Sequence, residues 1–136
     1  MVRETMKDPT FLMRPSAPAT EADRGVADDL RDTLAAHSDE CVGMAANMIG
    51  VSRRIIIVND NGKFLEMFNP EIVGKSGEYS AEEGCLSLMG VRTATRYKNI
   101  TVKWQTRDMK PQMGMFSGFT AQIIQHEVDH CNGVLI

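Results

Sequence analysis

The feature that most constrains this chain is a His-Glu-x-x-His motif at residues 126–130, after which only six residues remain before the chain stops at Ile136. Residues four apart share one face of an α-helix, so the His126 and His130 imidazoles can hold one metal ion together. The Glu127 carboxylate can then reach a water on that ion, which is the helical half of a zinc-type hydrolase site. We therefore expect a C-terminal helix with His126 and His130 as metal ligands and Glu127 as the catalytic base.

A catalytic ion of this type needs a third protein ligand, and the sequence after His130 does not supply one. Sites of the form H-E-x-x-H-x-x-G-x-x-H take a histidine six residues beyond the second one. Gly133 fits that pattern, but the last position is Ile136. The third ligand must therefore come from earlier in the chain. Cys85 is the preferred candidate, because a thiolate completes a Cys/His/His set with an open fourth position and Gly84 lets the backbone approach closely.

Each of these residues also has an interpretation in which it serves the fold alone. Cysteines often act as small buried apolar side chains, which is the alternative for Cys85 and the role that we expect for Cys41 and Cys131. A five-letter motif also arises by chance on a polar helix face. His37 stands at an expected helix end, where an imidazolium suits the helix dipole, so capping is favoured over ligation. The remaining upstream candidates are Glu82 and Glu83.

Composition and charge are those of one ordinary globular domain. Hydrophobic residues make up 43% of the 136 residues and charged residues 24%, enough for one core. The net charge of −3 and the lack of a basic run argue against direct nucleic-acid binding. The longest apolar run, 55–58, is far too short for a membrane span, and the first twenty residues hold no signal-peptide core. Three cysteines without an export signal favour a reducing, cytoplasmic setting.

The apolar pattern predicts a helix near the start of the chain. Residues 1–19 are polar and contain prolines, which predicts an extended arm packed on the domain. Val26, Leu30 and Leu34 then recur every four residues after an acid-rich start. This spacing predicts an amphipathic helix over about 21–37.

The middle of the chain predicts many short strands. An Asn-Gly turn within 59–62 joins two strands into a hairpin, and the pair Asn69-Pro70 is expected to break the second strand. A helix starting at 117–120 carries the histidine motif. The order helix, strands, helix predicts a compact single α+β domain over 1–136, with antiparallel sheets around the last helix. The expected strands are 54–58, 63–68, 72–73, 77–79, 92–97, 101–105 and 112–116.

Three ordered segments of the chain form a recognisable set. Residues 83–87 read E-G-C-L-S, residues 125–130 read Q-H-E-V-D-H, and residues 41–48 read C-V-G-M-A-A-N-M. They resemble the peptide deformylases, whose motifs are G-h-G-h-A-A-x-Q, E-G-C-h-S and Q-H-E-h-D-H (h apolar). The second and third motifs stand complete here, and the likeness covers roughly residues 20–136. Three ordered motifs are far more specific than one. The resemblance implies an α+β fold around the motif-bearing helix and hydrolysis of the formyl group from N-formylmethionyl peptides.

The resemblance also implies a metal, roles and partners. Cys85, His126 and His130 would hold one divalent ion, natively Fe²⁺, with Zn²⁺, Ni²⁺ or Co²⁺ as substitutes in the same N/N/S set. Glu127 would take the proton of the attacking water and deliver it to the leaving amine. The partner would be the nascent bacterial chain, with a transient ribosome contact. That contact would not use the C-terminal extension of many members, because this chain ends at Ile136.

Further residues are expected around the reaction centre. The Leu86 backbone N–H is the candidate donor to the oxyanion. Glu83 is expected to orient the active-site loop, and Asp129 either hydrogen-bonds a metal ligand or forms a solvent-facing salt bridge. An extended peptide would be held by strand-like addition. The residues expected to contact it are Val42, Gly43, Gly84, Ile124 and Gln125, with plain core packing as the alternative for Ile124.

The first motif departs from the family at both ends. Cys41 stands where glycine is usual, and Met48 stands where the family has the glutamine whose amide stabilises the oxyanion. A thioether has no hydrogen to donate. Losing one such donor typically costs about 10²–10³ in kcat, or roughly 3–4 kcal/mol. Two alternatives to a deformylase therefore stay open: an amidase for another N-acyl substrate, and a catalytically silent relative that binds metal or peptide.

Overall fold

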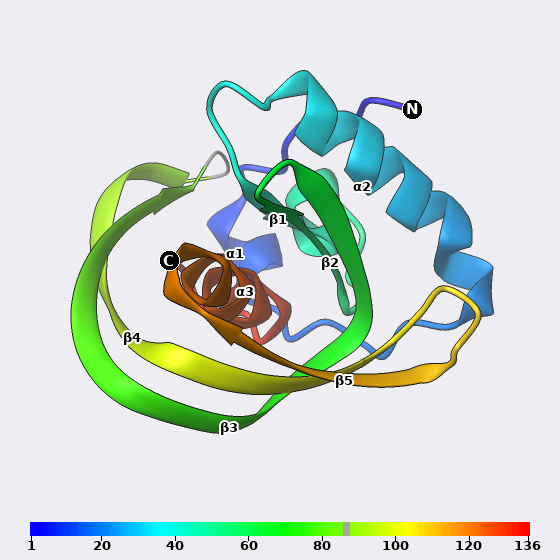
Figure 1. Ribbon diagram of the computed structural model, residues 1–136. Coiled ribbons are helices and arrows are strands. Elements are labelled where there is room, and N and C mark those ends of the chain that lie inside the picture. Colours follow the sequence, from blue (N-terminus) through cyan, green and yellow to red (C-terminus); the bar gives the residue numbers. More distant parts are fainter. Residues whose placement is uncertain (86–87) are drawn as a thin grey trace.

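A long, curled antiparallel sheet wraps around the C-terminal helix in the computed structural model, which describes residues 1–85 and 88–136 (Figure 1). In those residues the sheet order is β1-β2-β3-β4-β5, and each strand pairs antiparallel with the next. This is the predicted α+β architecture around the motif-bearing helix. The elements are α1 (Pro9–Leu12), a 3₁₀ helix (Glu21–Asp23), α2 (Arg24–Ala36), β1 (Gly43–Ala45), a 3₁₀ helix (Ala46–Ile49), β2 (Ile55–Asp60), β3 (Lys63–Cys85), β4 (Leu88–Gln105), β5 (Pro111–Ser117) and α3 (Gly118–Cys131).

The N-terminal helix lies close to its predicted position. The chain enters α2 through the 3₁₀ helix Glu21–Asp23, and a capping box fixes the start of that helix. In this box the Ala22 N–H donates to Thr20 Oγ1, and the Thr20 N–H donates to Asp23 Oδ2. α2 ends at Ala36, and His37 occupies its C-cap as expected.

The arm before α2 is less extended than predicted. It contains the helical turn α1, because Asp8 caps that turn and Pro9 suits its first position. The arm is tied to the domain by the Met6 N–H, which donates to the Met48 carbonyl at 2.6 Å, and by a bridge between Ala17 and Arg53.

The strands are longer than predicted. The expected pieces within 63–79 merge into β3, and those at 92–97 and 101–105 merge into β4. Asn69-Pro70 does not end the strand, because the pairing with β4 shifts register between Phe68 and Glu71 and then resumes. Asn69 takes a positive φ of 52°, and its side chain accepts from the Ala19 N–H at 2.7 Å. The bulge thus accommodates a proline that an unbroken ladder would exclude.

The core lies on both sides of β2. Its first four residues, 55–58, are fully buried, which explains their continuous apolar run. Leu30 and Leu34 of α2 belong to this core, and so do Ile124 and Val128 of α3. Figure 1 shows α2 and α3 separated by β1 and β2, so α3 is enclosed between this layer and the curl of β3 and β4. The histidine motif is therefore held inside the sheet.

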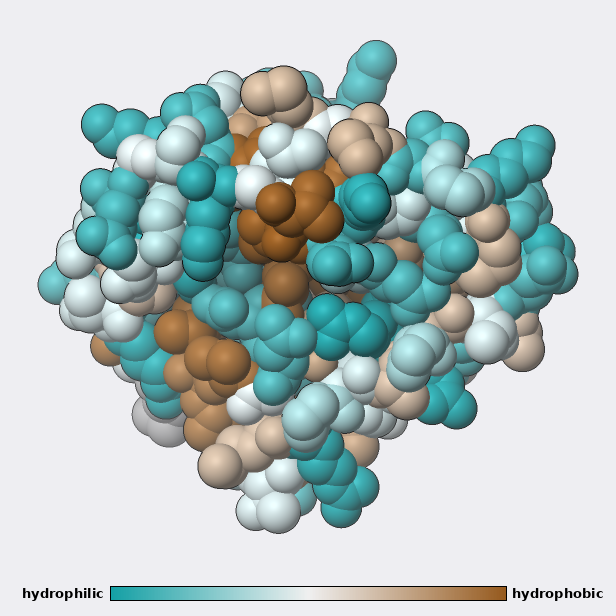
Figure 2. Space-filling view, turned by 90° about the horizontal axis from the view of Figure 1, so that it is seen from below, coloured by the Kyte–Doolittle hydropathy of each residue, from teal (hydrophilic) through white to brown (hydrophobic). Residues whose placement is uncertain are grey.

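The surface is mixed in character. On the face drawn in Figure 2, hydrophobic residues form small groups among hydrophilic ones. Among the described residues no helix has the length and apolarity needed to cross a membrane.

Candidate active site

The two motif histidines face each other from successive turns of α3. Their Nε2 atoms lie 3.1 Å apart, and both residues are buried. Two nitrogens bound to one tetrahedral ion at 2.0–2.1 Å are separated by about 3.3 Å. The spacing therefore suits two ligands of one ion.

Cys85 reaches the same point from the end of β3. The Cys85 Sγ and a ring nitrogen from each of His126 and His130 all lie within 4.8 Å of one another. The donor set is one sulfur and two nitrogens, which suits several first-row divalent ions. Hence the structure brings the three predicted ligands together, and their geometry fits a single metal ion.

Glu127 lies beside these ligands in the interior. Its side chain is 3% exposed, and its Oε1 has no hydrogen-bond partner among the residues described. Burial raises the pKa of Glu127 to about 7, although the neighbouring His126 opposes the shift. A carboxyl with a pKa near neutrality can both accept and return a proton at physiological pH.

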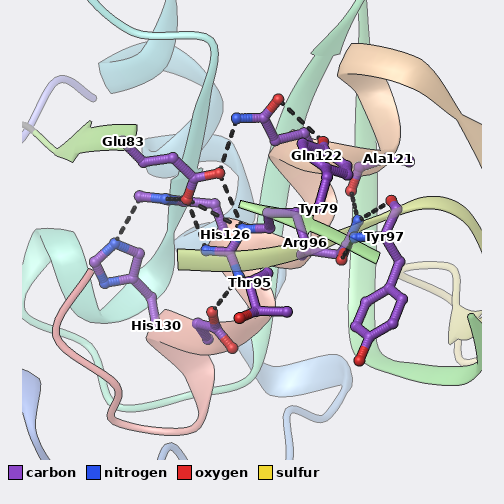
Figure 3. Close-up of polar contacts among 11 residues, drawn as sticks. Tyr79, Glu83, Thr95, Arg96, Tyr97, Ala121, Gln122, His126 and His130 are labelled. Carbon is purple, nitrogen blue, oxygen red and sulfur yellow. Dashed lines mark hydrogen bonds and ion pairs between the residues drawn. The ribbon is translucent and has the colours of Figure 1, made fainter. Parts of the chain in front are cut away.

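Glu83 supports His126 from behind. His126 Nδ1 lies 2.8 Å from Glu83 Oε1 (Figure 3). If His126 Nε2 binds a metal, Nδ1 carries the proton and donates to this carboxylate. A histidine that binds a metal through one ring nitrogen usually donates from the other nitrogen to such a partner. Burial alone would raise the pKa of Glu83, but hydrogen bonds from His126, Arg96 and Gln122 lower it to about 2. The carboxylate is therefore charged and able to accept.

His130 is held differently. Burial and the nearby His126 lower the pKa of His130 to about 3, so its ring is neutral, as a metal ligand must be. The Asn47 amide donates to the His130 carbonyl at 2.8 Å, which ties the motif helix to the 3₁₀ helix that follows β1.

A cavity of about 550 Å³ opens onto Cys85, His126 and Glu127. Val42, Gly43 and Gly84, which were expected to contact substrate through their backbones, line it. A Cβ on Gly43 would lie 2.5 Å from Ile123 Cγ2 and 3.0 Å from Glu127 Oε2. Only glycine lets β1 approach the Glu127 carboxylate this closely. Further lining residues are Glu40, Cys41, Met48, Glu82, Glu83, Gly90, Phe119, Gln122 and Ile123.

Known proteins share both the sequence and this fold. The sequence model of the family described as polypeptide deformylase matches residues 4–136. The peptide deformylase of Clostridium beijerinckii is 46% identical over 136 residues, which is 100% of both chains. This chain belongs to the peptide deformylase family. The resemblance drawn from the three motifs is thereby confirmed, and the family is one of metal-dependent hydrolases acting on an amide.

Solved deformylase structures agree with that assignment. The Met-Ala-Ser-bound class I type b peptide deformylase of Acinetobacter baumannii superposes with a TM-score of 0.89 at 31% identity, over 99% of this chain and 97% of that one. A peptide deformylase of Legionella pneumophila gives a TM-score of 0.88 at 35% identity, over 99% of this chain and 83% of that one.

Two of the expected substrate contacts do not line the cavity. Ile124 is fully buried in the core, which was its alternative role. Gln125 accepts from the Tyr97 N–H at 2.9 Å and donates to the Tyr97 carbonyl at 2.8 Å, so its amide anchors α3 to β4. Gln122 and Ile123 line the cavity instead. They lie one helical turn before His126 and Glu127, so the motif itself contained this signal.

The departures in the first motif both face the cavity. Met48 lines it, and its Sδ accepts from the Ala45 N–H at 3.4 Å. Cys41 lines the cavity too and is not only a packing residue, whereas Cys131 is buried in the core as expected. Burial raises the pKa of Cys41 to about 12, so its thiol is neutral and donates to the Gly43 carbonyl at 2.8 Å. The predicted Leu86 donor lies outside the described residues.

Proposed function

We propose that this chain is a metal-dependent peptide deformylase that removes the formyl group from N-formylmethionyl chains. The observation that carries the proposal is the convergence of Cys85, His126 and His130 beside the buried Glu127, at a cavity open to substrate. The family match over residues 4–136 supports it. Fe²⁺ is the ion that we propose for the cell, and Zn²⁺, Ni²⁺ or Co²⁺ would suit the same donors.

The chemistry follows from the placement of the side chains. A bound ion would lower the pKa of a water and polarise the formyl oxygen. Glu127 accepts the proton of the attacking water through its unpartnered Oε1 and then delivers it to the leaving amine. The Leu86 backbone N–H is the proposed donor to the developing oxyanion.

The substrate backbone would lie along β1. This strand is at the end of the sheet order, so one of its edges is available for an added strand. Val42, Gly43 and, across the cavity, Gly84 supply the proposed backbone contacts. The methionine side chain would lie against Ile123 and Phe119 rather than against the core residue Ile124.

Met48 is the reason that we expect a slow rate of deformylation. Its sulfur can only accept, and it is directed to the Ala45 N–H of its own turn. We therefore expect deformylation slowed by about 10²–10³ relative to a member with glutamine at this position. A site of action on nascent chains in the cytoplasm, with a transient ribosome contact, belongs to the same proposal.

The test is an assay of the purified, metal-loaded protein on formyl-Met-Ala-Ser. The A. baumannii relative is known with Met-Ala-Ser bound, which is this peptide without its formyl group. We expect turnover that is lost in Glu127→Ala and raised in Met48→Gln. No turnover in either the parent or Met48→Gln would reject the proposal. Hydrolysis of other N-acyl peptides would then indicate an amidase, and metal binding without any hydrolysis would indicate a silent relative.

A further inference from the structure

We propose that Arg96 is a positioning residue that fixes the metal ligand His126 by joining Glu83 and Asp129 into one hydrogen-bonded network. The inference rests on the metal site of the proposed function and assigns the residue that holds its outer layer together. Arg96 comes from the middle of β4, and none of the sequence motifs contains it.

The contacts of Arg96 form a continuous chain to the ligand (Figure 3). Its Nε and Nη2 donate to both oxygens of Glu83, at distances of 2.7–3.1 Å. Its Nη1 donates to Asp129 Oδ2 at 2.7 Å. Glu83 Oε1 in turn lies 2.8 Å from His126 Nδ1. Arg96 and Glu83 are both buried, so the charge-assisted bonds between them form away from water and are among the strong ones, whereas the Asp129 side chain is 29% exposed.

The network joins the elements that supply the ligands. Asp129 and His126 lie three residues apart on α3, and therefore on one face. Arg96 consequently holds α3 at two points, directly through Asp129 and indirectly through Glu83. Cys85 follows Glu83 by two residues on β3. Fixing Glu83 against α3 therefore also fixes the approach of the thiolate to the two imidazoles.

Charge balance explains why an arginine is needed. The carboxylates of Glu83 and Asp129 with one guanidinium leave a net charge of −1, which favours a nearby cation. Without Arg96, the buried Glu83 carboxylate would lose the guanidinium that holds both of its oxygens and would turn away from its present position. It would then no longer accept from His126. A lysine keeps the charge but lacks the planar fork that reaches both carboxylates.

The chain contains a matched control. Arg107 also bridges two carboxylates, with bonds of 3.0 and 2.7 Å to Glu66 and 2.9 Å to Asp28. It connects the turn after β4 with α2 and β3, and it does not line the catalytic cavity. Arg107→Lys removes the same kind of fork without touching the proposed ligands.

The experiment compares Zn²⁺ affinity, by competition with a chromophoric chelator, in the parent, Arg96→Lys, Asp129→Asn and Arg107→Lys. We expect Arg96→Lys to weaken binding by about 10–100-fold, the usual effect of losing an outer partner of a ligand. Asp129→Asn should weaken it less, and Arg107→Lys should leave it unchanged. In histidine-selective ¹H–¹⁵N spectra, the His126 Nδ1–H should exchange faster with water in Arg96→Lys than in the parent.

Parental Zn²⁺ affinity in a folded Arg96→Lys variant would overturn the inference. If circular dichroism shows that Arg96→Lys does not fold, Asp129→Asn becomes the test. Parental Zn²⁺ affinity in Asp129→Asn, together with an unchanged His126 Nδ1–H signal, would then overturn the inference. The readout does not depend on turnover. If the parent protein binds Zn²⁺ but does not hydrolyse formyl-Met-Ala-Ser, the proposed function is refuted. The role of Arg96 is still decided by the Zn²⁺ affinities of the variants.

Discussion

Gly43→Ala is predicted to damage stability and catalysis together. The added Cβ would lie 2.5 Å from Ile123 Cγ2, and 3.0 and 3.2 Å from Oε2 and Cγ of Glu127. Real Cβ contacts are not this short, so β1 or α3 must shift. Ile123 is branched at Cβ, the carbon that carries the clashing methyl, and its side chain is buried, so the methyl cannot simply rotate away. Overpacking of this kind costs about 1–3 kcal/mol.

The same shift should displace the catalytic base. A misplacement of about 1 Å at a reacting group can reduce the rate by about 10². We therefore expect Gly43→Ala to lower kcat on formyl-Met-Ala-Ser by about 100-fold, and to lower the free energy of unfolding in urea by about 1–3 kcal/mol. Zn²⁺ should still bind, since neither clash involves a proposed ligand.

Two variants make this prediction specific. Gly25→Ala is the matched control, because a Cβ there meets nothing within 4 Å and the residue lies in α2. It should stabilise the fold by about 0.5–1 kcal/mol and leave kcat unchanged. Ile123→Ala removes the clashing methyl, so Gly43→Ala should cost less stability in that background than in the parent. Parental kcat and parental stability in Gly43→Ala would refute the reasoning.

Three further predictions concern single side chains. Glu127→Gln should abolish turnover but keep one Zn²⁺ per chain by metal analysis, and loss of the ion would contradict its assignment as base. Asn47→Ala should destabilise the protein by about 0.5–1.5 kcal/mol in urea, because the His130 carbonyl loses one of its donors and keeps the Gly133 N–H at 3.1 Å. The pKa of Glu83 is lowered from 4.5 to about 2, so its contribution to stability is present above about pH 4.5 and is lost as the pH falls towards 2. In chelator-treated protein, Glu83→Gln should therefore weaken the pH dependence of the free energy of unfolding in urea over this range. A pH dependence equal to that of the parent would refute the lowered pKa of Glu83.

Much of the fold could be predicted from local patterns. The four-residue recurrence of Val26, Leu30 and Leu34 predicted α2, and the histidine motif predicted which face of α3 carries the two histidines proposed as metal ligands. The continuity of β3 could not be predicted in this way. Asn69-Pro70 is a strong local breaker, and the strand continues because Asn69 bonds to Ala19, which is 50 residues away in the sequence. A bulge held by distant partners leaves no local signal.

The candidate site, like the fold, could be predicted from the sequence only in part. The two histidines proposed as ligands followed from a motif whose residues share one helix face, but Arg96 lies in an ordinary alternating strand. Its partners Glu83 and Asp129 are 13 and 33 residues away, so only the paired strands and the packed helix bring them together. The absence of Ile124 and Gln125 from the residues that line the cavity has a different cause. Their positions follow from the helical period, which places residues 122 and 123, and not 124 and 125, on the face of His126 and Glu127.

X-ray absorption at the zinc edge of the Zn²⁺-loaded protein measures directly whether Cys85, His126 and His130 bind one ion. We predict one sulfur at about 2.3 Å and two imidazole nitrogens at about 2.0–2.1 Å, with one further light atom. In Cys85→Ser the sulfur shell should disappear. A parent spectrum without sulfur, or a sulfur shell that persists in Cys85→Ser, would show that β3 and α3 do not share an ion.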